Sequence, residues 1–403
     1  MHSSILSRLP TVHTHSSRRS SLQWLLLVAI LLLLGMSMPS AQARAATVAY
    51  TWSDGASAPL ARFEAQGLVV GGKLYVLGGF YDKSLRATAR VDVYDIAANS
   101  WRRLANLPEP LTHAGQTVDG NTIYLVGGYV GDNPGPSTDH VWKYNIGSNT
   151  WSAGPALPAS RGGGAVVVLN HKLHFFGGAT RRQGSKSSTA DQAEQFVLDL
   201  DGGTRWITAA PLPNPRNHLG AAVLNGKAYV LGGQHTYQEG TTSQKQVDVY
   251  NPATDSWTRA ADLPHSRSHI SASTFVMDGR LIVAGGSVNN GSSGASTTEV
   301  AMYDPGSNKW SQLPALPSGR KTPVAGTDGT LIVVSTGGQS SATSTTWCAT
   351  PQSLSASAAE QPLYSDAAST AAFVTAQDNV NQGQGFFCDF PEPAANGAAG
   401  GNW

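Results

Sequence analysis

The chain has 403 residues, of which only 13% are charged, and it carries 44 glycines and 10 tryptophans. This length suits one large domain or two ordinary ones, and so few charges among so many glycines favour an all-β, turn-rich chain over a helical one. A formal net charge of +1 offers no basic face for nucleic acid, so we expect no nucleic-acid partner.

The N-terminal segment predicts a secretory signal. A pair of arginines precedes the apolar run "WLLLVAILLLLGM" at residues 24–36, which is shorter than the roughly 20 residues of a membrane span. Ala41-Gln42-Ala43 fits the small-x-small cleavage rule, and Ala43-Arg44-Ala45 is a second option. We therefore expect residues 1–43 to be a signal peptide and the protein to be secreted or held in the periplasm or cell envelope. An uncleaved anchor is the alternative.

The charge balance after cleavage also predicts no nucleic-acid partner. Removal of residues 1–43 takes away three arginines and no acid, which leaves 24 basic and 26 acidic residues. No later segment is long and apolar enough to span a membrane, so we expect no membrane span after signal cleavage.

Six copies of one unit follow at a spacing of 49 to 55 residues, and a period near 50 indicates an array of identical supersecondary units. Each copy has a glycine pair and a tryptophan, and four copies have a tyrosine seven residues before the tryptophan. The glycine pairs are Gly78-Gly79, Gly127-Gly128, Gly177-Gly178, Gly232-Gly233, Gly285-Gly286 and Gly337-Gly338. The tryptophans are Trp52, Trp101, Trp151, Trp206, Trp257 and Trp310, and the tyrosines are Tyr94, Tyr144, Tyr250 and Tyr303.

Each unit reads as four short strands, a to d. In one copy "HLGAAVLN" is strand a, "KAYVLGG" strand b and "QVDVY" strand c, and strand d begins near Trp257. Turn signals such as Asn225-Gly226 separate strands a and b. Glycines that close strand b, Tyr-Asp closing strand c and Trp opening strand d resemble the kelch repeat over about residues 47–338. That resemblance implies an all-β, six-bladed β-propeller with its tryptophans packed between blades.

The copies are out of phase at the two ends, which predicts how the ring closes. Residues 48–52, "VAYTW", lack strands a to c of their own, so we expect them to supply strand d of the last blade, whose other strands come from about residues 321–348. Residues 44–348 then form the propeller. Residues 349–403 are rich in Ala, Ser and Gly and predict a mostly disordered tail, with "GFFCDF" at 385–390 as an exception that could dock.

The chain has two cysteines, Cys348 and Cys388. In an exported protein an even pair is a disulfide candidate. Two free thiols are the alternative.

Two patterns mark candidate binding residues. The loops between strands b and c are long, polar and different from one another, which is where binding usually resides on a rigid scaffold. Strand a also begins with an arginine in five copies and carries Glu, His, Gly or Thr two residues later. The candidate ligand-binding residues are Arg62, Glu64, His113, Arg161, Arg216, His218, Arg267, His269 and Arg320. Arginines suit carboxylate or sugar-acid ligands, and a purely structural role is the alternative.

The three histidines invite a metal interpretation, but they share no short spacing, so we expect no metal and no cofactor. Enzymes on this fold offer further comparisons. The Cys–Tyr radical site of galactose oxidase does not fit two cysteines beyond the last glycine pair, and the iron motif of plant specifier proteins is missing. The architecture is similar to that of exported bacterial sialic-acid mutarotases, although no matching active-site motif stands out.

The sequence therefore predicts a monomeric, exported binding module that recognises a glycan or a protein through its polar loop face. A sugar mutarotase or epimerase with a sialic-acid-like substrate is the alternative, in which Glu64 would act with Arg62 or His113. A structural or adhesive part of a larger envelope assembly is a third possibility.

Overall fold

The computed structural model describes residues 50–351 except 134, 185–190, 238–239, 292 and 340. The expected signal peptide, residues 352–403 of the expected tail and Cys388 lie outside the described residues. Within them the chain forms strands and a single 3₁₀ turn, η1 (Ser271–Ser273), and no α-helix. No helix among these residues has the length and hydropathy needed to cross a membrane.

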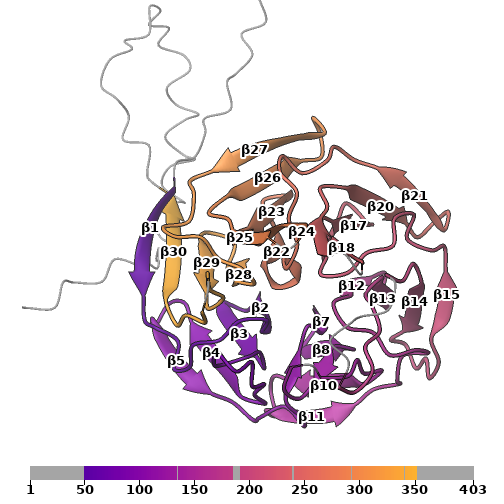
Figure 1. The fold of residues 1–403 in the computed structure, drawn as a ribbon, viewed down its shortest axis with the longest axis horizontal. Coiled ribbons are helices and arrows are strands. Elements are labelled where there is room, and N and C mark those ends of the chain that lie inside the picture. Colours follow the sequence, from indigo (N-terminus) through magenta and orange to yellow (C-terminus); the bar gives the residue numbers. More distant parts are fainter. Residues whose placement is uncertain are drawn as a thin grey trace, which may run out of the picture. The chain divides into compact units, whose positions relative to one another are not determined.

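Six four-stranded antiparallel sheets surround a central axis, which confirms the predicted six-bladed propeller (Figure 1). We number the blades along the chain and give their strands from the axis outward. Blade 1 contains β2 (Gln66–Val70), β3 (Lys73–Leu77), β4 (Val91–Asp95) and β5 (Ser100–Arg103). Blade 2 contains β7 (Gly115–Asp119), β8 (Thr122–Val126), β10 (Val141–Asn145) and β11 (Thr150–Ala153). Blade 3 contains β12 (Ala165–Leu169), β13 (Lys172–Phe176), β14 (Gln195–Asp199) and β15 (Ile207–Ala209).

The other three blades repeat this order. Blade 4 contains β16 (Gly220–Leu224), β17 (Lys227–Leu231), β20 (Val247–Asn251) and β21 (Ser256–Arg259). Blade 5 contains β22 (Thr274–Met277), β23 (Arg280–Ala284), β26 (Val300–Asp304) and β27 (Lys309–Leu313). Blade 6 contains β28 (Val324–Thr327), β29 (Ile332–Ser335), β30 (Thr346–Pro351) and β1 (Tyr50–Gly55).

The ring closes as predicted, with the first described strand on the outside of the last blade. β1 pairs antiparallel with β30 in a register that runs from Tyr50 opposite Pro351 to Gly55 opposite Thr346. In Figure 1 the indigo β1 lies directly beside the yellow β30. Strands from both ends of the array therefore share one sheet, and the outer edge of β30 is covered.

Each repeat tryptophan joins its blade to the preceding one. Its indole N–H donates to the carbonyl four residues after the preceding tryptophan: for example, Trp257 Nε1 donates to Ala210 O at 2.9 Å and Trp101 Nε1 to Ala56 O at 2.7 Å. The same bond from Trp52 to Pro314 O, at 3.1 Å, closes the series. The remaining pairs are Trp151 with Ala105, Trp206 with Pro155 and Trp310 with Ala261.

The repeat tyrosines hold the side-chain oxygen that accepts the N–H of the same linker residue. Tyr250 donates its hydroxyl to Asp255 Oδ1 at 2.8 Å, and the same carboxylate oxygen accepts the N–H of Ala210 at 2.9 Å. Blades 1, 2 and 5 repeat the arrangement with Asn99, Asn149 and Asn308 as the acceptors.

Proline explains the two copies that have no tyrosine. In blades 3 and 6 the peptide bonded by the tryptophan belongs to Pro155 or Pro314, and proline has no N–H to satisfy. Leu198 and Ala349 take the place of the tyrosine there, with Ala349 opposite Trp52 in the ladder. The two copies without a tyrosine are therefore those in which the linker residue has no N–H to be bonded.

The glycine pairs lie where strand b comes close to the backbone of the next blade. Gly232 has φ +53°, and a Cβ there would lie 2.5 Å from the carbonyl oxygen of Arg267 in the next blade. The N–H of Gly233 donates to that same carbonyl at 2.9 Å. A side chain at Gly232 would push neighbouring blades apart.

Two loops contain strands that the sequence did not predict. The b–c loops of blades 4 and 5 fold into hairpins, β18 (Gln234–Tyr237) with β19 (Gly240–Ser243) and β24 (Ser287–Gly291) with β25 (Ser293–Ser296), and these join in the order β18-β19-β24-β25. A shorter pair forms between β6 (Leu111–Thr112) and β9 (Tyr129–Val130). The polar loops therefore have regular backbone structure of their own.

Candidate functional site

Six equivalent positions, one just before the inner strand of each blade, adopt a left-handed backbone conformation. They are Glu64, His113, Gly163, His218, His269 and Thr322, with φ between +49° and +70°. This conformation is uncommon for residues other than glycine and tends to occur at functional positions. Main-chain bonds link neighbouring members: Gly163 N donates to His113 O at 2.9 Å, and His269 N to His218 O at 2.8 Å. We call this set the axial ring.

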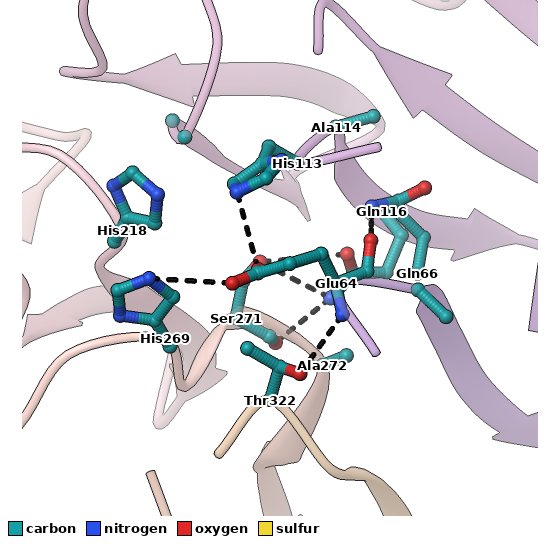
Figure 2. Close-up of a pocket in the computed structure, with 13 residues that line it drawn as sticks. Glu64, Gln66, His113, Ala114, Gln116, His218, His269, Ser271, Ala272 and Thr322 are labelled. Atoms are coloured by element: carbon teal, nitrogen blue, oxygen red, sulfur yellow. Dashed lines mark hydrogen bonds and ion pairs between the residues drawn. The ribbon is translucent and has the colours of Figure 1, made fainter. Parts of the chain in front are cut away.

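The axial ring encloses a small cavity on the side of the b–c loops. The cavity has a volume of about 30 Å³, which is room for one or two water molecules. Gln116 and Ser271 lie across its floor: Gln116 Nε2 donates to Ser271 O at 2.7 Å (Figure 2). A wider channel of about 300 Å³, lined mainly by valines, alanines and threonines of the inner strands, lies beyond this floor.

Glu64 is the centre of the side-chain contacts in this cavity. Its Oε2 lies 3.2 Å from His113 Nε2, and its Oε1 lies 3.3 Å from His269 Nε2. Figure 2 shows the carboxyl group between these two rings, with His218 beside them. The ring centroids of His218 and His269 are 4.2 Å apart. Of the two partners predicted for Glu64, the structure places His113 beside it.

Burial keeps these groups uncharged. It raises the pKa of Glu64 to about 8, against the smaller opposing effects of Lys321 and Arg181. It lowers the pKa of His269 to about 3 and the pKa values of His113 and His218 well below the usual value. At neutral pH the contacts are therefore between a carboxylic acid and neutral imidazoles rather than between ions.

The five arginines before strand a are buried, and none of them lines this cavity. Arg216 is fully buried and bonds to Asp248 at 2.8 Å, while it also donates to Gly232 O at 2.6 Å and Val230 O at 3.1 Å. Arg62, Arg161 and Arg267 pair in the same way with Asp92, Glu194 and Glu299 of their own blades. The structural alternative accounts for these contacts, and a ligand contact by the arginines stays a prediction.

Blades 2 and 6 depart from this pairing. Blade 2 has the fully buried Leu111 in place of the arginine. Arg320 of blade 6 bonds to Thr345, and its guanidinium lies 3.9 Å from the centroid of the Trp347 ring. Burial lowers the pKa of Arg320 to about 10. Its charge is met by an aromatic face and a hydroxyl instead of a carboxylate.

Side chains of the b–c loops bond to one another across blades. The Arg181 guanidinium lies 3.9 Å from the Tyr129 ring centroid and donates to Asn133 Oδ1 at 3.2 Å. The backbone N–H of Ala87 donates to Asp132 at 2.8 Å. These contacts tie blades 1, 2 and 3 together above the axial ring.

The sequence missed how the axial residues converge. The three histidines are far apart in sequence, but equal phase in the repeat places them at one end of the axis, and their ligand atoms lie within 4.8 Å of one another. It also missed Gln116 and Ser271. The available signal was the polar residue that precedes each histidine, in Thr112-His113, Asn217-His218 and Ser268-His269.

Of the two cysteines, Cys348 lies fully buried in β30 within the core of blade 6 and blade 1. Cys388 is outside the described residues. The predicted disulfide between them stays a prediction.

Six four-stranded antiparallel blades, glycine pairs in contact with the next blade and tryptophans bonded to the preceding one define a six-bladed β-propeller of the kelch type. Residues 112–338 match the KLHDC2/KLHL20/DRC7 Kelch-repeats domain, and residues 61–108 match the Kelch motif. The chain belongs to the kelch-repeat family, as the resemblance predicted.

Curated relatives share the repeats. Kelch-like protein 15 of Mus musculus is 30% identical over 262 residues, which cover 60% of this chain and 41% of that protein. Kelch-like protein terF of Aspergillus terreus is 29% identical over 254 residues, 60% of this chain and 53% of that protein. Kelch-like protein 23 of Mus musculus is 31% identical over 219 residues, 54% of this chain and 36% of that protein. The chain thus spans about a third to a half of the length of these relatives.

Among solved structures, that of YjhT is similar with a TM-score of 0.60. It covers 72% of this chain and 95% of that one, at 16% sequence identity. At this identity the similarity bears on the fold alone.

Proposed function

We propose that this propeller is a binding module that recognises another protein through the face formed by its b–c loops. The observation that carries the proposal is the layer of loops bonded across blades, with the hairpins β18–β19 and β24–β25 joined into one sheet. Polar loops held in place on a rigid scaffold are the usual site of recognition, and holding them before binding reduces the entropy lost on binding.

The side chains of this face favour a protein partner over a glycan. Among the described residues, Ile207 on the outer strand β15 is the only large exposed hydrophobic side chain. Two aromatic rings of the loops are already covered: Tyr129 lies beneath Arg181, and Arg86 lies 5.1 Å from the Tyr81 centroid. Neither of these two rings offers a platform for a sugar, whereas exposed charges such as that of Arg86 suit a polar protein interface.

The mutarotase alternative requires an acid, a base and room for a sugar. Glu64 and His113 supply a proton-transfer pair with a raised carboxyl pKa. The cavity around them holds only about 30 Å³, far below the few hundred Å³ of a typical small-molecule site. The geometry therefore supports binding better than turnover.

We also propose that the protein is exported, since the N-terminal segment has the charge, apolar run and small residues of a secretory signal. Its monomeric state stays a proposal. N-terminal sequencing of the protein recovered outside the cytoplasm tests the export, and a mature chain that begins near Arg44 is expected. A chain that retains residues 1–43 in the cytoplasm would contradict it.

Partner binding is tested with two charge-reversal variants on opposite faces. R86E/R182E changes exposed arginines of the loop face, and K227E changes an exposed lysine at the start of β17, directly after the a–b turn of blade 4. A partner is identified by crosslinking and then purified, and its affinity for each variant is measured by titration. We expect at least a tenfold weaker complex with R86E/R182E and no change with K227E. A partner that responds to K227E alone would contradict the proposal.

A sugar panel separates the alternatives. Ligand-observed NMR with reducing sugars that include sialic acid reports binding by saturation transfer and turnover by anomer exchange. We expect neither. Binding without exchange would replace the protein partner by a glycan, and accelerated exchange that is lost in Glu64→Gln would make the chain an enzyme.

A further inference from the structure

Three imidazoles and one carboxyl group from four different blades meet at one end of the propeller axis. His113, His218 and His269 offer nitrogens within 4.8 Å of one another, and the Glu64 carboxyl lies 3.2 and 3.3 Å from two of them. The left-handed backbone at each position is held by a separate blade. The donors are therefore positioned by the rigid frame rather than by one loop.

The second nitrogen of every imidazole is bonded to the residue before it. His113 Nδ1 lies 2.9 Å from Thr112 Oγ1, and His269 Nδ1 lies 2.9 Å from Ser268 Oγ. His218 Nδ1 bonds to Asn217 Oδ1. Bonds of this kind accompany almost all metal-binding histidines, because they orient the ring and select its tautomer.

The contacts of Asn217 show which nitrogen of His218 is available. Its Nδ2 donates to Asp191 Oδ1, so its amide oxygen faces the imidazole. That oxygen accepts a hydrogen bond from Nδ1–H, while Gln234 Nε2 also lies 3.3 Å from Nδ1. In the tautomer with the proton on Nδ1, the lone pair of Nε2 is left for a ligand. Asp191 itself is nearly buried, and it also contacts His235 at 3.2 Å.

We propose that His113, His218 and His269 bind one divalent transition-metal ion, such as Zn²⁺, with Glu64 as the fourth ligand. Three nitrogens and one oxygen suit zinc and its neighbours in the first transition row. Bonds of about 2.0–2.1 Å in a tetrahedron place ligand atoms about 3.3 Å apart. The imidazoles therefore need to approach one another by no more than about 1.5 Å.

The fold does not itself require histidine at these positions. The equivalent residues of blades 3 and 6 are Gly163 and Thr322, which adopt the same conformation. Arg181 and Lys321 lie close enough to affect the pKa of Glu64, and a bare cation would be repelled by them. Glu64 loses its proton when it binds the metal, and the resulting carboxylate compensates for this repulsion.

Metal analysis of the full chain tests the proposal. The protein is stripped with a chelator, dialysed and titrated with Zn²⁺, with Co²⁺ absorption as a second probe of the ligand geometry. We expect one ion per chain. His218→Gly removes one ligand, and Gly163 shows that glycine is compatible with this backbone conformation. Metal binding should weaken by more than about 100-fold.

Three further variants keep the result interpretable. His265→Ala removes a histidine that is 67% exposed and should bind metal like the wild type. Glu64→Gln should weaken binding. Ser268→Ala leaves all four ligands in place and removes the hydroxyl bonded to His269, together with the contacts of that hydroxyl to Ser243, Ser287 and Asn289. A tenfold to 100-fold loss is therefore expected even if His218→Gly fails to fold. Wild-type protein without stoichiometric metal, or unchanged binding in both Ser268→Ala and His218→Gly, would overturn the proposal.

Discussion

The ion pair between Arg216 and Asp248 offers a quantitative test of how the blades are held together. Both side chains are fully buried, and Nη1 lies 2.8 Å from Oδ2. In Asp248→Ala the guanidinium remains buried, because it still donates to Gly232 O at 2.6 Å and to Asn214 O at 2.8 Å. Gln246 Nε2 also loses its carboxylate acceptors, at 2.8 and 3.0 Å.

An unpaired charge left in such a place costs about 3–5 kcal/mol. We therefore expect Asp248→Ala to lower the free energy of unfolding by about that amount. Asp248→Asn keeps an oxygen acceptor and should lie between this variant and the wild type. Equilibrium urea unfolding, followed by tryptophan fluorescence, gives the values from the shift in midpoint at constant slope.

The matched control is Asp262→Ala, which removes a partner of Arg259 at the surface, where Arg259 is 51% exposed. Its midpoint should stay at the wild-type value, because exposed pairs contribute little. A loss below about 1 kcal/mol in Asp248→Ala would refute the argument that the buried charge depends on its carboxylate.

Three other variants test the frame. Trp257→Ala should lower the free energy of unfolding by about 3 kcal/mol in the same urea assay. This is the low end for an aromatic residue, because the ring is only partly buried. A loss under 1 kcal/mol would contradict its role between blades. Gly226→Ala and Gly232→Ala share a positive φ, but only the second meets a neighbouring carbonyl, so the first should cost about 1–2 kcal/mol and the second clearly more. Equal losses would show that the close approach of blades is unimportant. Deletion of β1 should lower the melting temperature of the propeller. An unchanged value in calorimetry would show that the pairing of β1 with β30 does not stabilise the ring.

The frame was predictable because each blade must repeat the same contacts. A glycine that meets the next blade and a tryptophan that bonds to the preceding linker recur at a fixed phase, so six copies in the sequence became six blades. The closure by β1 followed from Trp52, which has no strands of its own blade before it. These features depend on residue type at a fixed position in the repeat.

The loops and the axial site were less accessible. The b–c loop of blade 5, "SVNNGSSGASTT", has no alternation of apolar and polar residues, and its strands β24 and β25 pair through backbone bonds that such a pattern does not reveal. The convergence of Glu64 with His113 and His269 depends on where one phase of the repeat points. Spacing along the chain carries no such information, although a comparison of the six copies position by position would have grouped these residues.

For the arginines before strand a, the sequence analysis did not identify partners within the blades. They were predicted to bind a ligand because guanidinium suits carboxylates, and the structure supplies a carboxylate from within the blade to every one of them except Arg320. Asp92 and Asp248 each precede the repeat tyrosine by two residues. A search for acids at that phase would have found these two partners, but not Glu194 and Glu299, which lie four residues before Leu198 and Tyr303.

The pairing of β1 with β30 in blade 6 also has a consequence for synthesis of the chain. Ser53 of β1 and Cys348 of β30 are 295 residues apart in the chain, so at about 5–20 residues per second a ribosome needs roughly 15–60 s to make the partner of β1. Until β30 has been made, β1 has no partner strand, and blade 6 cannot cover the faces of blades 1 and 5 that it contacts in the finished ring. A chaperone, or transport in an unfolded state, would have its greatest effect in that window, before the last strand arrives.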